Sequence, residues 1–178
     1  GERDGTASLE ELLRIFDADR TPEIRTQILR SLAERSDPRA QAKLLEVARK
    51  GETPELRIEA IRRLGERGRI SIEDLLTLYS SETNVSIKQG LIRVYAETDD
   101  PRARVKLFEI AKSGDSPDLR LYAIRRLGEK NDDQTVEQLT AMYDAETNFQ
   151  VKGMLIRAFG DSNQKAAVRK LMSIARND

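Results

Sequence analysis

Apolar residues recur at helical spacing along most of the chain, in short segments that Gly, Pro and Asp residues interrupt. In the first segment, Leu9, Leu12 and Phe16 fall on one face of a helix. Ser8 and Glu11 have the spacing of a capping box at the start of this helix. A second apolar segment follows after a few residues, so the pattern predicts a helical hairpin.

The hairpin pattern repeats with a nearly constant period. Counted from the first apolar residue of each second helix, the copies are 32, 31, 32 and 32 residues apart. These reference residues are Ile24, Leu56, Ile87, Leu119 and Val151. Every proline falls at a predicted first helical position, where the missing amide hydrogen costs nothing, and these are Pro22, Pro38, Pro54, Pro101 and Pro117. Residues able to cap the second helices precede them, at Thr21, Thr53, Asn84, Ser116 and Asn148.

We therefore predict five hairpins and one final helix. The hairpins span about residues 8–36, 37–67, 70–98, 100–130 and 134–161, and a half repeat spans 164–176. We expect residues 8–176 to form one domain, and residues 1–7 to be a tag remnant or a disordered linker of a longer parent protein. Segments 38–66 and 101–129 are identical at 18 of 29 positions, as duplication of a two-hairpin block would leave them.

The second helices also carry a family pattern. Leu56, Arg57, Ala60, Leu64 and Gly65 match the spacing V-R-x-x-A-x-x-x-L-G. The chain resembles the HEAT-like repeat family over roughly residues 8 to 176, particularly its short bacterial and phycobilisome-lyase-like branch, although most second helices lack the preceding Asp-Pro of that family. The resemblance implies an all-α fold, an α-solenoid coiled as a right-handed superhelix, and usually a protein-binding scaffold.

A basic residue follows each reference residue, inside the predicted apolar arc. These residues are Arg25, Arg57, Lys88, Arg120 and Lys152. A charge at such a position is costly unless it is paired. The family resemblance implies a structural role for them, bridging neighbouring repeats through acids or helix-end carbonyls. Asp19, Glu82 and Glu146 are candidate partners because they precede second helices at matching places.

A second row of basic residues lies six positions after each reference residue, opposite the apolar arc. It consists of Arg30, Arg62, Arg93, Arg125 and Arg157, which we call the arginine ladder. An acid stands four residues beyond each member, at Glu34, Glu66, Glu97, Glu129 and Asp161. The ladder is therefore open to three interpretations: a solvated face of self-neutralised pairs, a surface for an acidic protein or peptide, or a nucleic-acid surface, which the paired acids disfavour.

A few apolar residues lie beside the ladder, where polar residues were expected. They are Ile58, Leu121, Tyr122 and Met154. They either pack under adjacent repeats or, exposed together, form part of a peptide-binding hot spot centred on Tyr122.

Composition narrows the possible functions. Lys plus Arg and Asp plus Glu both total 31, so the chain has no basic excess of the kind that nucleic-acid binders show. It contains no His and no Cys, which removes the commonest general base and the commonest metal ligands. We therefore predict no catalytic residue, no metal site and no cofactor. No apolar segment is long enough to insert across a membrane, and the compartment, cytoplasmic or exported, stays undetermined.

Together these patterns predict a non-enzymatic scaffold. We expect it to bind a protein or peptide, an acidic one among the candidates, through the concave surface of the solenoid. The alternatives are binding of a polyanion or nucleic acid along the arginine ladder, and a purely structural spacer. A tetrapyrrole lyase or chaperone-like role, implied only by the resemblance, is less favoured because aromatic residues make up 4% of the chain.

Overall fold

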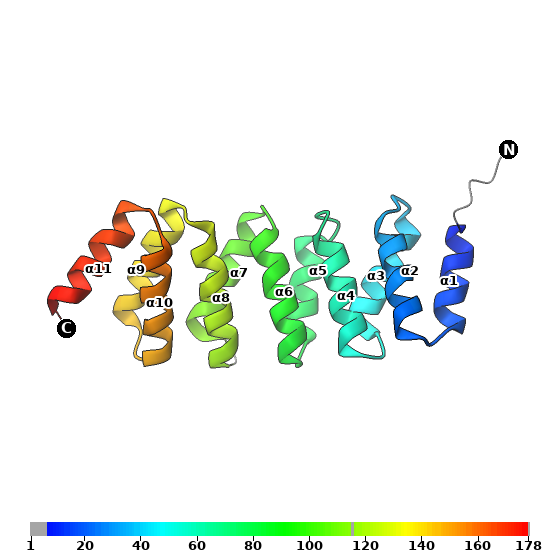
Figure 1. Cartoon of the computed structure of the whole chain (residues 1–178), viewed down its shortest axis with the longest axis horizontal. Helices are drawn as coiled ribbons and strands as arrows, with labels where there is room; N and C mark the ends of the chain where they lie inside the picture. The colour runs from blue at the N-terminus through cyan, green and yellow to red at the C-terminus, as the bar shows by residue number, and fades with distance from the viewer. Residues whose placement is uncertain (1–6, 115, 178) are drawn as a thin grey trace. The chain divides into compact units, whose positions relative to one another are not determined.

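The computed structural model describes residues 7–114 and 116–177, and these residues form α-helices joined by short turns, without strands (Figure 1). The helices are α1 (Leu9–Ala18), α2 (Pro22–Ala33), α3 (Pro38–Lys50), α4 (Pro54–Gly65), α5 (Ile72–Ser81), α6 (Val85–Glu97), α7 (Pro101–Ser113), α8 (Pro117–Lys130), α9 (Asp133–Ala145), α10 (Phe149–Asp161) and α11 (Lys165–Asn177). The predicted all-α class and the order of the helices are confirmed.

Local capping chemistry explains where most helices begin. Each proline is the first residue of its helix, in α2, α3, α4, α7 and α8. The capping box of Ser8 and Glu11 is present at α1. Four of the predicted second-helix caps accept backbone hydrogen bonds in the first turn of their helices, namely Thr53, Asn84, Ser116 and Asn148. The prediction for Thr21 was wrong: its side chain makes no cap bond, and its own amide donates to Asp19 Oδ1 (2.8 Å).

The start of the fifth hairpin also differs from the prediction. Helix α9 begins at Asp133, one residue before the predicted boundary, and the carboxylate of Asp132 caps it by accepting from the amide of Thr135 (2.9 Å). Thr135 is fully buried in the first turn of α9. The sequence predicted a tag remnant or linker over residues 1–7, and residues 1–6 of it lie outside the described part of the chain. Ala7 is described, and its carbonyl accepts a hydrogen bond from Arg35.

The chain divides into two compact units, one ending at Val94 and the other beginning at Tyr95. In the first unit, α2 packs on α1, α3 and α4, and α3 packs on α4. In the second unit, α8 packs on α7, α9 and α10, while α11 packs on α9 and α10. Within each unit, hairpins therefore stack with second helix against second helix, as predicted for a solenoid, whereas the handedness of a superhelix stays a prediction.

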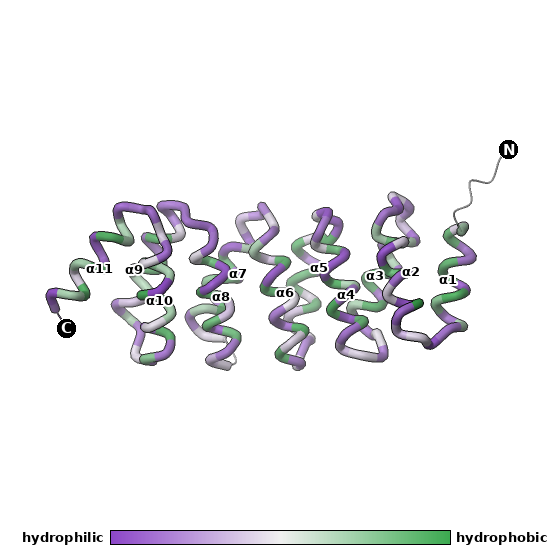
Figure 2. Tube along the Cα trace, in the orientation of Figure 1, coloured by the Kyte–Doolittle hydropathy of each residue, from purple (hydrophilic) through white to green (hydrophobic). Residues whose placement is uncertain are grey.

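The core lies between the stacked hairpins, where the apolar faces of neighbouring helices meet (Figure 2). Leu56, Ile87 and Val151 are at most 6% exposed. Ile24, the equivalent residue of the first hairpin, is 38% exposed because no hairpin precedes it in the described part of the chain. Burial at the reference positions thus comes from the neighbouring hairpin, since a single hairpin cannot cover its own apolar face.

Candidate binding surface on the second helices

Two arginines of the apolar arc join three helices each. Nε of Arg57 in α4 donates to the carbonyl of Ala48 in α3 (3.0 Å), and its guanidinium forms an ion pair with Glu82 at the end of α5. Arg120 repeats this geometry in the second unit, with a carbonyl near the end of α7 (2.9 Å) and with Glu146 at the end of α9. Two of the candidate acids, Glu82 and Glu146, therefore each form an ion pair with the basic residue of the preceding second helix.

The other members of this group sit on aromatic rings. Each cation lies between 4.8 and 5.1 Å from the ring centre, and the pairs are Arg25 on Phe16, Lys88 on Tyr79, and Lys152 on Tyr143. Sequence reasoning missed these partners, although each aromatic residue stands nine positions before its cation. Arg25 also bonds the carbonyl of Asp19 (2.8 Å) and the carboxylate of Glu52 (3.1 Å), so Asp19 contributes its backbone rather than its side chain.

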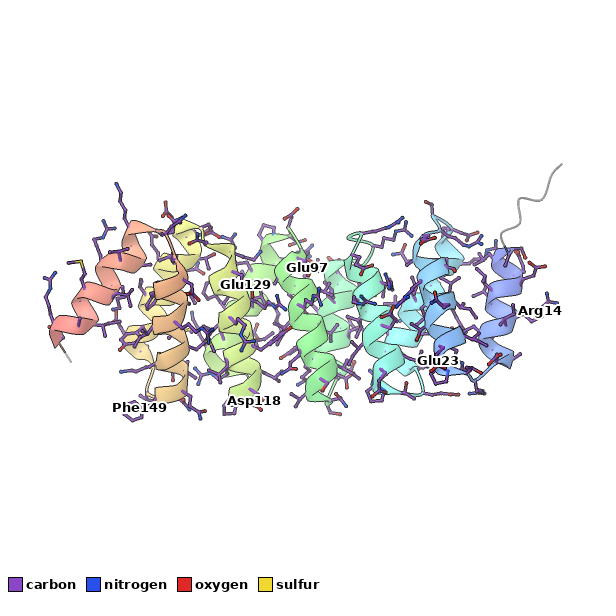
Figure 3. All side chains as sticks on the ribbon, in the orientation of Figure 1. Arg14, Glu23, Glu97, Asp118, Glu129 and Phe149 are labelled. Atoms are coloured by element: carbon purple, nitrogen blue, oxygen red, sulfur yellow. The ribbon has the colours of Figure 1, made fainter. Side chains whose placement is uncertain are left out.

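The arginine ladder lies on the opposite face of the second helices. Arg30, Arg93, Arg125 and Arg157 are exposed, and Arg62 is half-buried. The structure does not bring every ladder arginine to the acid four residues beyond it. The ion pair is present, though long, for Arg62 with Glu66 (3.8 Å) and for Arg157 with Asp161 (4.0 Å). In α8, Glu129 pairs with Arg126 instead (2.9 Å), and Glu129 is labelled in Figure 3.

In the first unit a carboxylate neutralises two arginines of the ladder. The side chain of Glu59 in α4 is only 13% exposed and lies 3.6 Å from Nε of Arg30 in α2. Its carboxylate also accepts from Arg62 (2.5 Å) and Arg63 (2.8 Å). Burial raises the pKa of Glu59, but the hydrogen bonds and charges of these two arginines outweigh burial and hold the pKa below its usual range. Arg30 and Arg62 thus share an internal counterion.

In the second unit a cleft opens between α8 and α10. It has a volume of about 370 Å³ and is lined by Arg125, Gly128, Glu129, Asn131, Met154, Arg157, Ala158 and Asp161. No described acid lies within ion-pair distance of Arg125. A Cβ on Gly128 would lie 3.0 Å from Cβ of Ala158, so the two helices approach closely at the floor of the cleft. We call this site the α8–α10 cleft.

Tyr122 does not line this cleft. Its hydroxyl accepts a hydrogen bond from Arg126 (3.0 Å), whose guanidinium lies 5.2 Å from the centre of the ring. Ile58, Leu121 and Met154 are half-buried, as is Tyr122 itself. Phe149, the first residue of α10, does not line the cleft either, but its side chain is 88% exposed (Figure 3).

A larger groove of about 860 Å³ lies along α7 and α9, where the sequence predicted no site. Two of its cations, Arg104 and Lys130, already have hydrogen-bond partners. Arg104 bonds Gln134 (2.8 Å) and pairs with Asp132 (3.4 Å), and Lys130 donates to the carbonyl of Ala96 (2.7 Å). We regard the smaller α8–α10 cleft as the stronger candidate, because two arginines of the ladder line it and neither has a close counterion among the described residues.

Comparison with known families agrees with this architecture. The family model described as HEAT repeats matches residues 105–178. This segment is therefore similar to HEAT repeats. The match confirms the resemblance to the HEAT-like repeat family and supports a repeat-scaffold role in general, while the bacterial branch stays a prediction. No curated protein matches the chain. None of the helices in the described residues is both long and apolar enough to cross a membrane.

Proposed function

We propose that this HEAT-repeat chain is a non-enzymatic scaffold that binds a peptide or protein segment on the face formed by its second helices. The observation that supports the proposal is the α8–α10 cleft, where Arg125 has no ion-pair partner among the described residues and Arg157 has only a long one. Exposed guanidinium groups with free donors recognise carboxylates in a planar, bidentate manner. A cleft with two such groups is suited to an acidic segment.

The floor of the cleft also suits an extended chain. Gly128 and Ala158 are small, and Met154 adds a flexible apolar surface beside them. A peptide backbone can approach small residues closely, and thioether side chains adapt to varied apolar partners. The site thus combines two charged anchors with an adaptable floor, which is what peptide-binding grooves generally require.

The alternatives make different demands on the surface. A nucleic acid needs a continuous positive field, whereas Glu59 neutralises part of the ladder and Glu129 and Asp161 flank the rest. A spacer needs no ligand at all. A gel shift with single- and double-stranded DNA and RNA at low salt tests the nucleic-acid alternative, and the peptide selection below tests the spacer.

The experiment is a selection of displayed random peptides on the immobilised full chain. Peptides should be enriched on the wild type and lost on the double variant Arg125→Glu with Arg157→Glu. The control variant is Arg169→Glu, because Arg169 is an exposed arginine of α11 outside the cleft. Equal enrichment on wild type and double variant would rule out this face, and no enrichment on either would favour the spacer.

A further inference from the structure

The two units contain equivalent positions with different chemistry. Glu59 stands three residues after the reference residue Leu56, and Met154 stands three residues after Val151. Arg62 and Arg157 stand six residues after the same reference residues. The stacked pairs α2–α4 and α8–α10 can therefore be compared residue by residue, each within its own unit.

In the α2–α4 pair, the equivalent position carries a carboxylate between two ladder arginines. Glu59 lies 3.6 Å from Arg30 on the preceding second helix and 2.5 Å from Arg62 on its own helix. Arg63, the next residue, adds a third contact of 2.8 Å. The carboxylate is largely buried, and its pKa lies below its usual range because the arginine hydrogen bonds outweigh the effect of burial. Guanidinium groups from two stacked helices therefore bind one carboxylate at this position.

In the α8–α10 pair, the same two arginine positions are kept and the carboxylate is missing. Arg125 is on the preceding second helix, Arg157 is on the following one, and Met154 replaces the glutamate. Ala158 stands where α4 has Arg63, so the site is also less crowded. The space left at this position is the cleft of about 370 Å³.

The acids that line the cleft do not fill that role. Asp161 reaches Arg157 only at 4.0 Å, with both side chains more than three-quarters exposed, and exposed pairs of this kind are weak. Glu129 is engaged by Arg126 at 2.9 Å. A carboxylate from outside the chain would therefore meet two guanidinium groups that no internal acid holds closely.

We propose that the α8–α10 cleft binds the carboxylate of an acidic peptide side chain, which takes the place that the Glu59 carboxylate occupies in the first unit. This inference rests on the proposed function and names its ligand group. Arg125 and Arg157 donate to the carboxylate oxygens, and the apolar stem of the ligand residue packs on Met154. The rest of the peptide follows the face of α8 and α10.

The test exchanges the two residues. Met154→Glu installs the internal carboxylate, so an acidic peptide should bind the cleft about tenfold or more weakly, since a charged hydrogen-bond partner is already present. Glu59→Met opens the equivalent site in the first unit and should add binding there. Met154→Leu, which keeps the floor apolar, should bind as the wild type does.

Binding is measured on the full chain by NMR titration of the arginine Nε–H resonances, which detects weak complexes residue by residue. The probes are capped pentapeptides with a central Glu, Gln or phosphoserine, and acetate alone. The Glu peptide should shift Arg125 and Arg157 in the wild type, and additionally Arg30 and Arg62 in Glu59→Met. Acetate should shift Arg125 and Arg157 more weakly, and the Gln peptide should not shift them.

Three results would overturn the inference: equal binding of the Gln and Glu peptides, undiminished binding of the Glu peptide to Met154→Glu, or binding of the phosphoserine peptide without the Glu peptide. The last result would assign the cleft to phosphate. Failure of the proposed function looks different, because then no displayed peptide is enriched and no ladder resonance moves. If the enriched peptides bind Met154→Glu as tightly as the wild type, the proposed scaffold function still holds and only the proposed carboxylate site is contradicted.

Discussion

Arg120 provides a strong test of how the hairpins are held together. The Arg120 side chain is 16% exposed, and its guanidinium bridges the end of α7 to Glu146 at the end of α9. The substitution Arg120→Met keeps an apolar stem of similar length and removes the guanidinium. The change leaves a carbonyl of α7 without its side-chain donor. It also leaves the Glu146 carboxylate, 7% exposed, without its charged partner.

The magnitude follows from what the buried carboxylate retains. Removing one partner of a buried ion pair costs about 3–5 kcal/mol when the other charge is left uncompensated. Glu146 keeps two backbone donors, the amides of Thr147 (3.1 Å) and Asn148 (2.9 Å), which lower the cost. We therefore expect Arg120→Met to reduce the free energy of unfolding by about 2–3 kcal/mol.

The assay is urea unfolding followed by circular dichroism, with hydrogen exchange of α8 and α9 to locate the loss. The control is Arg102→Met, since one partner of Arg102 is Asp100 at 2.8 Å, the Arg102 side chain is 58% exposed, and each exposed pair of this kind contributes at most about 1 kcal/mol. A double-mutant cycle with Glu146→Gln should show coupling of about 1 kcal/mol or more. The reasoning is refuted if Arg120→Met costs no more than Arg102→Met, or if the two changes are additive.

Three further predictions concern local features of the fold. Gly65→Ala should lower the melting temperature, because the new Cβ would lie 2.7 Å from a valine side chain of α6. Gly153→Ala meets no atom within 4 Å, so the higher helix propensity of alanine should raise the free energy of unfolding by about 0.5–1 kcal/mol. Since the pKa of Glu59 is lower in the folded chain, the ionised side chain contributes fully to the free energy of unfolding above the ordinary glutamate pKa, and this contribution is lost as pH falls through the lowered value. In urea unfolding between pH 6 and 3, Glu59→Gln should therefore lose less stability than the wild type does. An equal loss of stability in both proteins would contradict the assignment. Ser116→Ala should cost about 1 kcal/mol by removing an N-cap bond, whereas Thr21→Ala should cost little because Thr21 makes none; equal shifts in thermal melts would count against the capping argument.

Much of the fold could be predicted because its determinants are local. Helix starts follow from prolines and capping residues within a few positions of the first turn, and hairpin order follows from apolar periodicity. The two exceptions arose where a neighbouring aspartate carboxylate accepts a hydrogen bond from a backbone amide at the start of a helix. The Asp19 carboxylate accepts a hydrogen bond from the amide of Thr21, whose own side chain caps nothing. The Asp132 carboxylate caps α9, which therefore begins one residue before the predicted boundary.

The candidate site could be predicted only in part. The row of ladder arginines was visible in the sequence, and their exposure follows from the helical position opposite the apolar arc. The pairing of Arg30 with Glu59 could not be seen in the sequence, because these residues are on different hairpins and meet only when α2 packs on α4. The aromatic partners of Lys88 and Lys152 were missed for a different reason: each ring lies in the first helix of the same hairpin, and it meets its cation only when the two helices of the hairpin pack together.

The sequence by itself determined that this protein is a series of helical hairpins, because periodicity, prolines and caps act within single elements. Tertiary structure decided which charges neutralise one another and where space is left, since those outcomes depend on distances between helices that sequence spacing does not set. Glu59 closes one site of the ladder and Met154 leaves the equivalent site open, a difference of one side chain whose meaning appears only when neighbouring second helices are packed together.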